Sequence, residues 1–261
     1  MTKAQRKKNG FLGASPAKTA LKTARGKLIT FEGIEGSGKS THIRLLAERM
    51  RSSGFEIIEV REPGGTRVGE TIRLLLSRPA RSLPAVLCTA LQAGRCAPGA
   101  PGGKGGDETI CPPTELLLFM ASRAQLVQKK IIPALRRGAH VICDRFLDST
   151  SAYQGYARGC DLELIASLNA FAVQNLLPDL TILLDLGLRA GFRRLHFRNR
   201  RQGTEKDRIE SESAAFHERV RNGYLDLAGK NPERFYVVNA DRPVAKVRAD
   251  IWKAVRNVLE R

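Results

Sequence analysis

This sequence of 261 residues lacks several features that would assign it to a class at once. Its five cysteines are an odd number and include no CxxC pair, so neither a disulfide framework nor a zinc site is indicated. No apolar run approaches the roughly 20 residues that span a bilayer, and residues 1–27 lack the continuous apolar stretch of a secretory signal. We therefore expect a cytoplasmic protein with free thiols and no membrane contact.

Acidic residues are also scarce, and the net charge is +18. Two segments carry most of the excess: residues 1–27 have a net charge of +8 with no acid, and residues 189–208 have +6. The rest of the chain does not have the basic face with interleaved aromatics that is typical of nucleic-acid binding. Residues 1–26 are interpreted as a disordered basic arm, either a solvated appendage or a weak contact to a polyanion such as nucleic acid. The arm's composition also loosely resembles a transit peptide, which we rank below both.

Strand-like and helix-like segments alternate along the remainder of the chain. Short apolar, β-branched segments predict strands, and they read "KLITFEG", "FEIIEVREPGG", "HVICDR", "LTILLDL" and "FYVVNA". Segments of helical periodicity lie between them, including a long helix predicted from an N-cap at Thr114 to Gly138. This alternation predicts an α/β fold with a doubly wound parallel sheet, and ligands at the carboxyl ends of the strands.

One segment interrupts this alternation. Residues 79–112 are rich in glycine and proline and have no stable hydrophobic period. We interpret them as a long surface loop or partly disordered insertion, with no assigned function. The predicted organisation is therefore the basic arm, residues 1–26, followed by one domain, residues 27–261, that contains the insertion.

The stretch "GIEGSGKST", residues 33–41, matches the pattern G-x-x-x-x-G-K-S between a predicted strand and a predicted helix. Backbone N–H groups in such a loop can surround a phosphate, and the helix N-terminus adds the positive end of its dipole. Lys39 would reach the β- and γ-phosphates of a nucleoside triphosphate, and the Ser40 hydroxyl would bind Mg²⁺. The predicted phosphate-binding residues are Gly33, Ile34, Glu35, Gly36, Ser37, Gly38, Lys39, Ser40 and Thr41.

Five segments in order resemble those of thymidylate kinases. They are "FEGIEGSGKST", "REPGGTRVGETIR", "LLLFMASRAQLV" with "IIPAL", "DRFLDSTSAYQG" and "DRIESESAAFHERVRNGYLDLA". Together they extend from about residue 28 to the C-terminus and leave only the arm and the insertion outside. The resemblance implies a nucleoside monophosphate kinase fold of the P-loop type, a lid at about residues 189–208, and a homodimer packed through helices.

Phe119 and Arg123 are four residues apart on a predicted helix and therefore share a face. An aromatic ring can stack on a base while a guanidinium group binds an oxygen of the base or phosphate. From the helix alone, a core ring and a surface charge remain the alternative, and Tyr153 could equally pack against a helix start. The resemblance implies that the acceptor, thymidine monophosphate (dTMP), is bound by Glu62, Phe119, Arg123, Arg145, Thr150, Tyr153 and Gln154.

Asp144 and Arg145 end an apolar strand, in the place where α/β sheets bind ligands. The resemblance implies that Arg145 binds the acceptor phosphate and that Asp144 lies near Mg²⁺ and the same phosphate. It also implies that Glu35 faces the acceptor sugar and the lid, with Arg67 and Arg73 as further candidates for the acceptor phosphate. The predicted metal ligands are Ser40 and Asp144.

Phosphoryl transfer between two polyanions requires cations and alignment at the transferring group. The lid segment is rich in arginine, and the variable positions of the P-loop contain no basic residue. This resembles the bacterial arrangement, in which lid arginines supply the transition-state charge. The predicted catalytic residues are Lys39, Arg145, Glu35, Arg194, Arg198, Arg200 and Arg201, with a solvated helix or an RNA-binding patch as the alternative for the lid.

The loop "NADRP" resembles the family's border of the adenine site, which implies ATP as the phosphoryl donor. The activity implied is phosphorylation of dTMP to the diphosphate by MgATP in dTTP synthesis. The sequence leaves open which lid arginines enter the site and how strictly thymine is preferred to uracil.

Overall fold

The computed structural model describes residues 25–77, 110–203 and 208–260. The predictions made for the basic arm and for the insertion therefore fall almost entirely outside the described residues. Among the helices of the described part, none is both long and apolar enough to cross a membrane.

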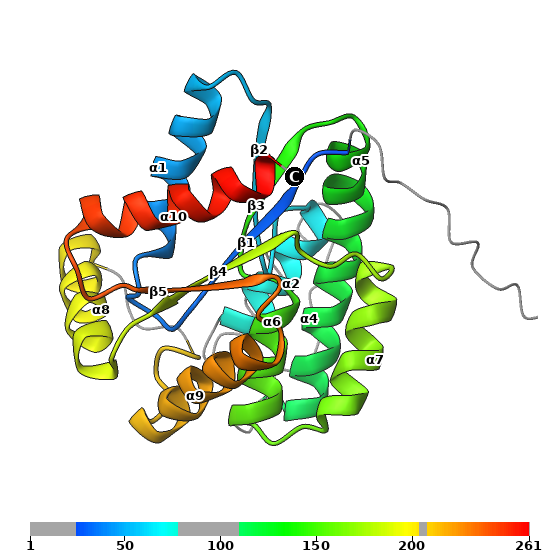
Figure 1. Ribbon diagram of the computed structural model, residues 1–261. Helices are drawn as coiled ribbons and strands as arrows, with labels where there is room; N and C mark the ends of the chain where they lie inside the picture. Colours follow the sequence, from blue (N-terminus) through cyan, green and yellow to red (C-terminus); the bar gives the residue numbers. More distant parts are fainter. Residues whose placement is uncertain (1–24, 78–109, 204–207, 261) are drawn as a thin grey trace, which may run out of the picture.

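A five-stranded parallel sheet in the order β2-β3-β1-β4-β5 forms the centre of the molecule (Figure 1). Its strands are β1 (Leu28–Glu32), β2 (Ile57–Arg61), β3 (His140–Asp144), β4 (Leu180–Asp185) and β5 (Phe235–Asn239). Every residue of the central strand β1 is buried, as expected for a strand covered on both faces. The predicted α/β fold with a doubly wound parallel sheet is confirmed.

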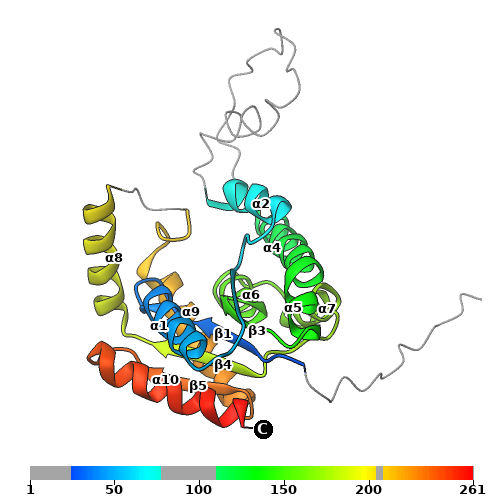
Figure 2. The same cartoon turned by 90° about the horizontal axis from the view of Figure 1, so that it is seen from above.

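Helices cover both faces of the sheet (Figures 1 and 2). On one face, α1 (Lys39–Ser52) and α10 (Val244–Leu259) pack over a core that includes Phe31, Met50 and Ile251. On the other face, α4 (Pro112–Leu126) continues through the π-helical turn η2 (Val127–Ile131) into α5 (Ile132–Arg136). The helices α7 (Leu162–Val173) and α9 (Ala214–Lys230) complete this second layer.

The elements around the carboxyl edge of the sheet are α2 (Arg67–Ser77), α6 (Leu147–Thr150), the π-helical turn η3 (Ser151–Ala157) and α8 (Leu188–Gln202). Figure 2, seen from above, shows α8 on one side of the molecule and α2 and α4 on the other. The predicted lid therefore corresponds largely to α8.

The long helix predicted from Thr114 begins earlier in the structure. Its first residue is Pro112, and Cys111 rather than Thr114 is the N-cap. Proline suits the first turn of a helix, because the N–H that it lacks would have no partner inside the helix. The far end agrees with the prediction, since Gly138 has φ 90° directly after α5.

Candidate functional site

A cavity of about 560 Å³ lies at the carboxyl edge of the sheet. Its lining comes from the β1–α1 loop, from the ends of β2 and β3, and from α2, α4, η3 and α8. The sequence-predicted residues that it includes are Glu35, Gly36, Gly38, Lys39, Ser40, Thr41, Glu62, Arg73, Phe119, Asp144, Arg145, Thr150, Tyr153, Gln154, Arg194 and Arg198. Residues predicted for the triphosphate and residues predicted for the acceptor thus line one continuous space.

The glycines of the P-loop are required by the backbone. Gly33, Gly36 and Gly38 all have positive φ, at 136°, 76° and 94°, which residues with a Cβ rarely adopt. A Cβ on Gly36 would lie 2.4 Å from the carbonyl oxygen of Gly191 in α8. The loop therefore packs directly against the start of α8, the helix that contains most of the predicted lid.

Lys39 is held inside this loop and is only 9% exposed. Its Nζ donates to the carbonyl oxygens of Gly33 at 2.9 Å and Ile34 at 3.0 Å. Burial, with a further contribution from the positive charge of Arg145, lowers the pKa of Lys39 to about 8. The ammonium group is thus held inside the phosphate-binding loop, where it donates hydrogen bonds to backbone carbonyl oxygens of the same loop.

Ser40, in the first turn of α1, and Asp144, at the end of β3, lie next to each other in the cavity lining. Ser40 Oγ lies 3.4 Å from Asp144 Oδ2 and donates to it. Asp144 Oδ1 is buried and has no hydrogen-bond partner among the described residues. A hydroxyl and a carboxylate are hard oxygen ligands, and Mg²⁺ usually takes one or two carboxylates together with water and substrate phosphates. The residues present therefore fit the predicted Mg²⁺ site.

Arg145 and Glu35 form an ion pair between β3 and the P-loop. Arg145 Nη2 lies 2.8 Å from Glu35 Oε1, which also accepts a bond from Tyr153 Oη at 2.6 Å. Burial disfavours the charge on Glu35, yet Arg145, His217 and Lys39 together hold the pKa of that carboxyl well below its usual range. Arg145 also has φ 66°, a strained conformation for a residue with a side chain. Two predicted catalytic groups are therefore held in a partly buried, ionised pair that lines the cavity.

Sequence reasoning missed the carboxylate behind this pair. Glu32, the last residue of β1, is fully buried and accepts bonds from Phe146 N at 2.7 Å, Ser149 Oγ at 2.6 Å and Tyr224 Oη at 2.7 Å. Burial, helped by the charge of Asp148, raises the pKa of Glu32 to about 7. Tyr224 Oη in turn accepts from Arg145 Nη1 at 3.2 Å. The sequence did contain one signal for Glu32, because a carboxylate at the end of a largely apolar strand is unusual.

Arg123 lies behind the acceptor side and does not line the cavity. Its side chain is 1% exposed and donates twice to Glu62 Oε2, at 2.8 and 2.6 Å. It also donates to Asn169 Oδ1 at 2.6 Å and to Thr150 Oγ1 at 2.9 Å. Burial raises the pKa of Glu62, and the charge of Arg123 opposes that change. The structure thus shows Arg123 as a buried support for Glu62 and Thr150, and its predicted contact with the base stays a prediction.

The other residues predicted to bind the acceptor do face the cavity. Phe119 is half-buried on α4 and lines the space, so it is not simply a core ring. Thr150, Tyr153 and Gln154 line it from α6 and η3. Of the two further candidates for the acceptor phosphate, Arg73 lines the cavity, whereas Arg67 is exposed and does not.

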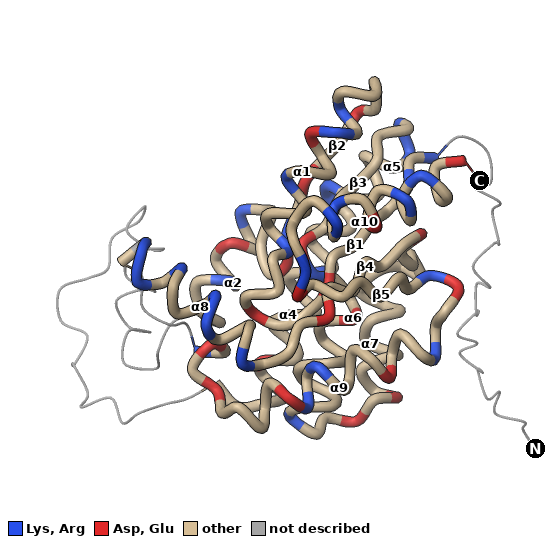
Figure 3. Tube along the Cα trace, turned by 60° about the vertical axis from the view of Figure 1, so that its left-hand side comes forward, with Lys and Arg blue, Asp and Glu red and all other residues tan. Residues whose placement is uncertain are grey.

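The four predicted lid arginines differ in position. Arg194 and Arg198 line the cavity, whereas Arg200 and Arg201 are exposed near the far end of α8 and do not. Arg194 donates to Ala240 O at 3.2 Å and lies 3.3 Å from Asp241, and Arg198 pairs with Glu210 at 2.5 Å. Figure 3 shows basic positions along α8. The helix α8 thus contacts the loop after β5 and the segment around Glu210.

Three comparisons with known proteins indicate the same family. A sequence model of a family described as "Thymidylate kinase" matches residues 31–91 and 106–251. A protein named "Thymidylate kinase" from Caldanaerobacter subterraneus subsp. tengcongensis is 41% identical over 237 residues, covering 90% of this chain and 98% of that protein. Another of that name from Desulfosudis oleivorans is 43% identical over 232 residues, covering 88% of this chain and 96% of that protein. A crystal structure of thymidylate kinase from Ehrlichia chaffeensis superposes with a TM-score of 0.61 at 32% identity, covering 88% of this chain and 99% of that one.

Proposed function

The chain belongs to the thymidylate kinase family, and from that premise we propose how its cavity performs the reaction. The reaction is transfer of the γ-phosphoryl group of ATP to dTMP, which gives ADP and thymidine diphosphate, a step of dTTP synthesis. The observation that carries the proposal is that the P-loop and the acceptor residues line one cavity of about 560 Å³. Both substrates can therefore lie in it at once, and transfer is direct and in line.

The donor side is formed by the β1–α1 loop. Its backbone N–H groups and the N-terminus of α1 hold the ATP phosphates. Lys39 exchanges its bonds to Gly33 O and Ile34 O for phosphate oxygens near the transferring group. Ser40 and Asp144 would hold Mg²⁺, which neutralises charge on the phosphates when it is bound.

The acceptor side is formed by α4, the end of β3 and η3. Phe119 stacks on thymine, and Gln154 and Thr150 lie around the base and sugar. Arg145 binds the phosphate of dTMP and exchanges part of its ion pair with Glu35 for it, since an arginine can bind phosphate with two parallel bonds. Glu62 Oε1 is buried and has no hydrogen-bond partner among the described residues. This oxygen can therefore accept a hydrogen bond from the acceptor.

The lid supplies the remaining positive charge. Arg194 and Arg198 approach from α8, opposite the acceptor side, and stabilise the charge that develops on the transferring group. The P-loop itself provides only Lys39, because Ile34, Glu35, Gly36 and Ser37 carry no cation. The lid arginines Arg194 and Arg198 therefore add to the positive charge that Lys39 and Arg145 place at the transferring group.

The homodimer that the sequence resemblance implies would pack through α4 and α7, which lie side by side. Large apolar side chains are exposed on both helices: Leu117 is 58% exposed, Leu164 is 52% exposed and Phe171 is 84% exposed. Exposed apolar side chains on neighbouring elements are typical of a surface that is buried in an assembly. This face lies away from α8, so dimer formation leaves the lid accessible.

The direct test is ADP release with MgATP and a panel of nucleoside monophosphates that contains the thymidine, deoxyuridine, guanosine, cytidine and adenosine forms. We expect strong preference for dTMP, with equal amounts of ADP and thymidine diphosphate formed. Preference for a guanosine or cytidine acceptor would retain the kinase chemistry and refute the acceptor assignment. No transfer to any acceptor would refute the proposed function.

A further inference from the structure

Glu115 is a buried carboxylate that lies directly behind the acceptor site. It belongs to the first turn of α4 and is 1% exposed. Its Oε1 accepts from Gln154 Nε2 at 2.7 Å and from Arg158 Nε at 3.3 Å. Its Oε2 accepts from Arg158 Nη2 at 3.3 Å and from Arg208, which reaches it from the segment that follows α8. Two cations and one amide therefore surround this single carboxylate.

The carboxylate is ionised near neutral pH. Burial disfavours its charge, but the bond from Gln154 and the charges of Arg208 and Arg158 outweigh burial and lower the pKa of Glu115. An ionised carboxylate can only accept hydrogen bonds. The atom of the Gln154 amide that faces Glu115 must therefore be the donor, Nε2.

This constraint fixes what Gln154 presents to the cavity. Gln154 lines the cavity although it is only 1% exposed. With Nε2 turned toward Glu115, the carbonyl oxygen Oε1 is the atom of the amide that is left for a ligand. No described residue donates a hydrogen bond to that oxygen.

We propose that Glu115 is a positioning residue that holds the Gln154 amide with Oε1 toward the acceptor base, and so selects pyrimidines that carry an N–H at N3. Thymine and uracil have this N–H, whereas N3 of cytosine is an acceptor and would face the amide oxygen without a hydrogen bond. A site built to bond a donor rejects an analogue that lacks it. The inference rests on the proposed function, because it takes Gln154 to be part of the acceptor site.

The substitution Glu115→Gln reverses the polarity of this contact. In this variant the amide oxygen is favoured at the Oε2 position, which accepts hydrogen bonds from both Arg158 and Arg208. The NH₂ group then occupies the Oε1 position and faces Gln154. Gln154 must then turn over and present Nε2 to the base. We expect the ratio of kcat/KM for dTMP to kcat/KM for dCMP to fall about tenfold or more, mainly through a higher KM for dTMP. Glu115→Asp, which keeps the carboxylate, should retain most of the preference.

Two further variants separate base selection from simple support of the fold. Glu212→Gln removes the other carboxylate that pairs with Arg158, at 2.7 Å, without touching Gln154, so it should leave the ratio unchanged. Gln154→Leu removes the amide and leaves the charged cluster intact, so it should lower the ratio as much as Glu115→Gln does. This variant tests the proposal even if Glu115→Gln does not fold.

The measurement is kcat and KM for dTMP, dUMP and dCMP with each variant, together with the midpoint of thermal unfolding. The proposal is overturned if Glu115→Gln and Gln154→Leu change the kinetics of dTMP and dCMP by the same factor. It is also overturned if Glu212→Gln lowers the ratio as strongly as Glu115→Gln. A wild-type enzyme without preference for dTMP over dCMP would instead refute the proposed function on which the inference rests.

Discussion

At the scale of single residues, the site is built from charges that neutralise one another inside the protein. Lys39, Glu35 and Arg145 are all largely buried, and each is bonded to a neighbour or to the backbone. A buried charge is costly unless it is paired, so these pairs keep the charges in place at tolerable cost. In the proposed mechanism, substrate phosphates and Mg²⁺ replace these existing partners, so no flexible side chains have to be ordered when they bind.

Lys39→Ala should lower kcat by at least about a hundredfold, because one group that stabilises the transition-state charge is removed. The fold should persist, since the variant also removes the cost of burying an ammonium group. Steady-state kinetics with MgATP and dTMP measures the effect, and thermal unfolding checks the fold. Lys253→Ala, an exposed lysine on α10, is the matched control and should keep normal turnover. Turnover close to that of the wild type in Lys39→Ala would contradict the P-loop assignment.

Glu32 gives the stability of the protein a defined pH dependence. Its pKa is about 7 in the folded protein, against 4.5 as the ordinary value, so the fold favours the protonated carboxyl. The stabilisation is fully present below about pH 4.5 and is lost as the pH rises through 7, by about 3 kcal/mol in total. We expect the free energy of unfolding of the wild type, relative to that of Glu32→Gln, to fall by this amount between pH 4.5 and 7. Chemical denaturation at several pH values measures it, and a difference that is constant or rises with pH would refute the account.

Single residues could be predicted from the sequence only where a motif fixes them. The glycines of the P-loop were predictable because their pattern reflects backbone angles that side chains disfavour. Arg123 could not be placed, because helical spacing shows which residues share a face but not whether that face borders a cavity. Glu32 could be noticed only as a carboxylate that ends an apolar strand, and Glu115 not at all, because their partners Gln154, Arg208 and Tyr224 are distant in sequence.

At the scale of elements, α8, which is the predicted lid helix, carries arginines in two environments. Arg194 and Arg198 line the cavity, and Arg200 and Arg201 lie further along the helix in solvent. The composition of the segment predicted a cationic lid, but it could not predict this division. Which arginines face inward depends on how α8 packs against the P-loop at Gly36 and Gly191.

Arg194→Ala and Arg198→Ala should therefore lower kcat at least about tenfold more than Arg200→Ala and Arg201→Ala. All four substitutions remove one charge from the same helix, so each pair controls for the change in net charge. The comparison needs only kcat at saturating ATP and dTMP. If Arg200→Ala or Arg201→Ala caused the larger loss, the arrangement of α8 described above could not be the one that performs the transfer.

At the scale of the whole molecule, the order of strands and helices was predictable because apolar runs and helical periods alternate clearly along the chain. The order of the strands in the sheet, with β1 between β3 and β4, was not, since it depends on packing rather than on local pattern. That order brings Ser40, which follows β1, next to Asp144, which ends β3.

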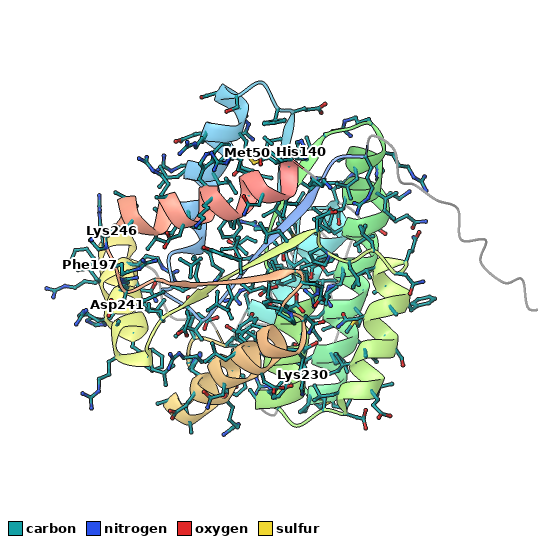
Figure 4. The ribbon with its side chains drawn as sticks, in the orientation of Figure 1. Met50, His140, Phe197, Lys230, Asp241 and Lys246 are labelled. Carbon is teal, nitrogen blue, oxygen red and sulfur yellow. The ribbon has the colours of Figure 1, made fainter. Side chains whose placement is uncertain are left out.

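Phe171→Glu should disrupt the proposed homodimer, because it places a charge on the apolar face formed by α4 and α7. We expect the dissociation constant of the dimer to rise at least about thirtyfold, which corresponds to roughly 2 kcal/mol. Sedimentation velocity over a range of protein concentrations measures it. Phe197→Glu is the matched control, since Phe197 is 69% exposed on α8, away from that face (Figure 4). An equal effect of both substitutions, or none of Phe171→Glu, would remove α4 and α7 as the interface.

The central claim is that one cavity holds ATP and dTMP together and that the phosphoryl group passes directly between them. The measurement that tests it most directly is the initial rate as a function of both substrate concentrations. Direct transfer within a ternary complex predicts double-reciprocal lines that intersect. Parallel lines, together with a phosphorylated form of the protein isolated after incubation with ATP alone, would show a covalent intermediate and would contradict the claim.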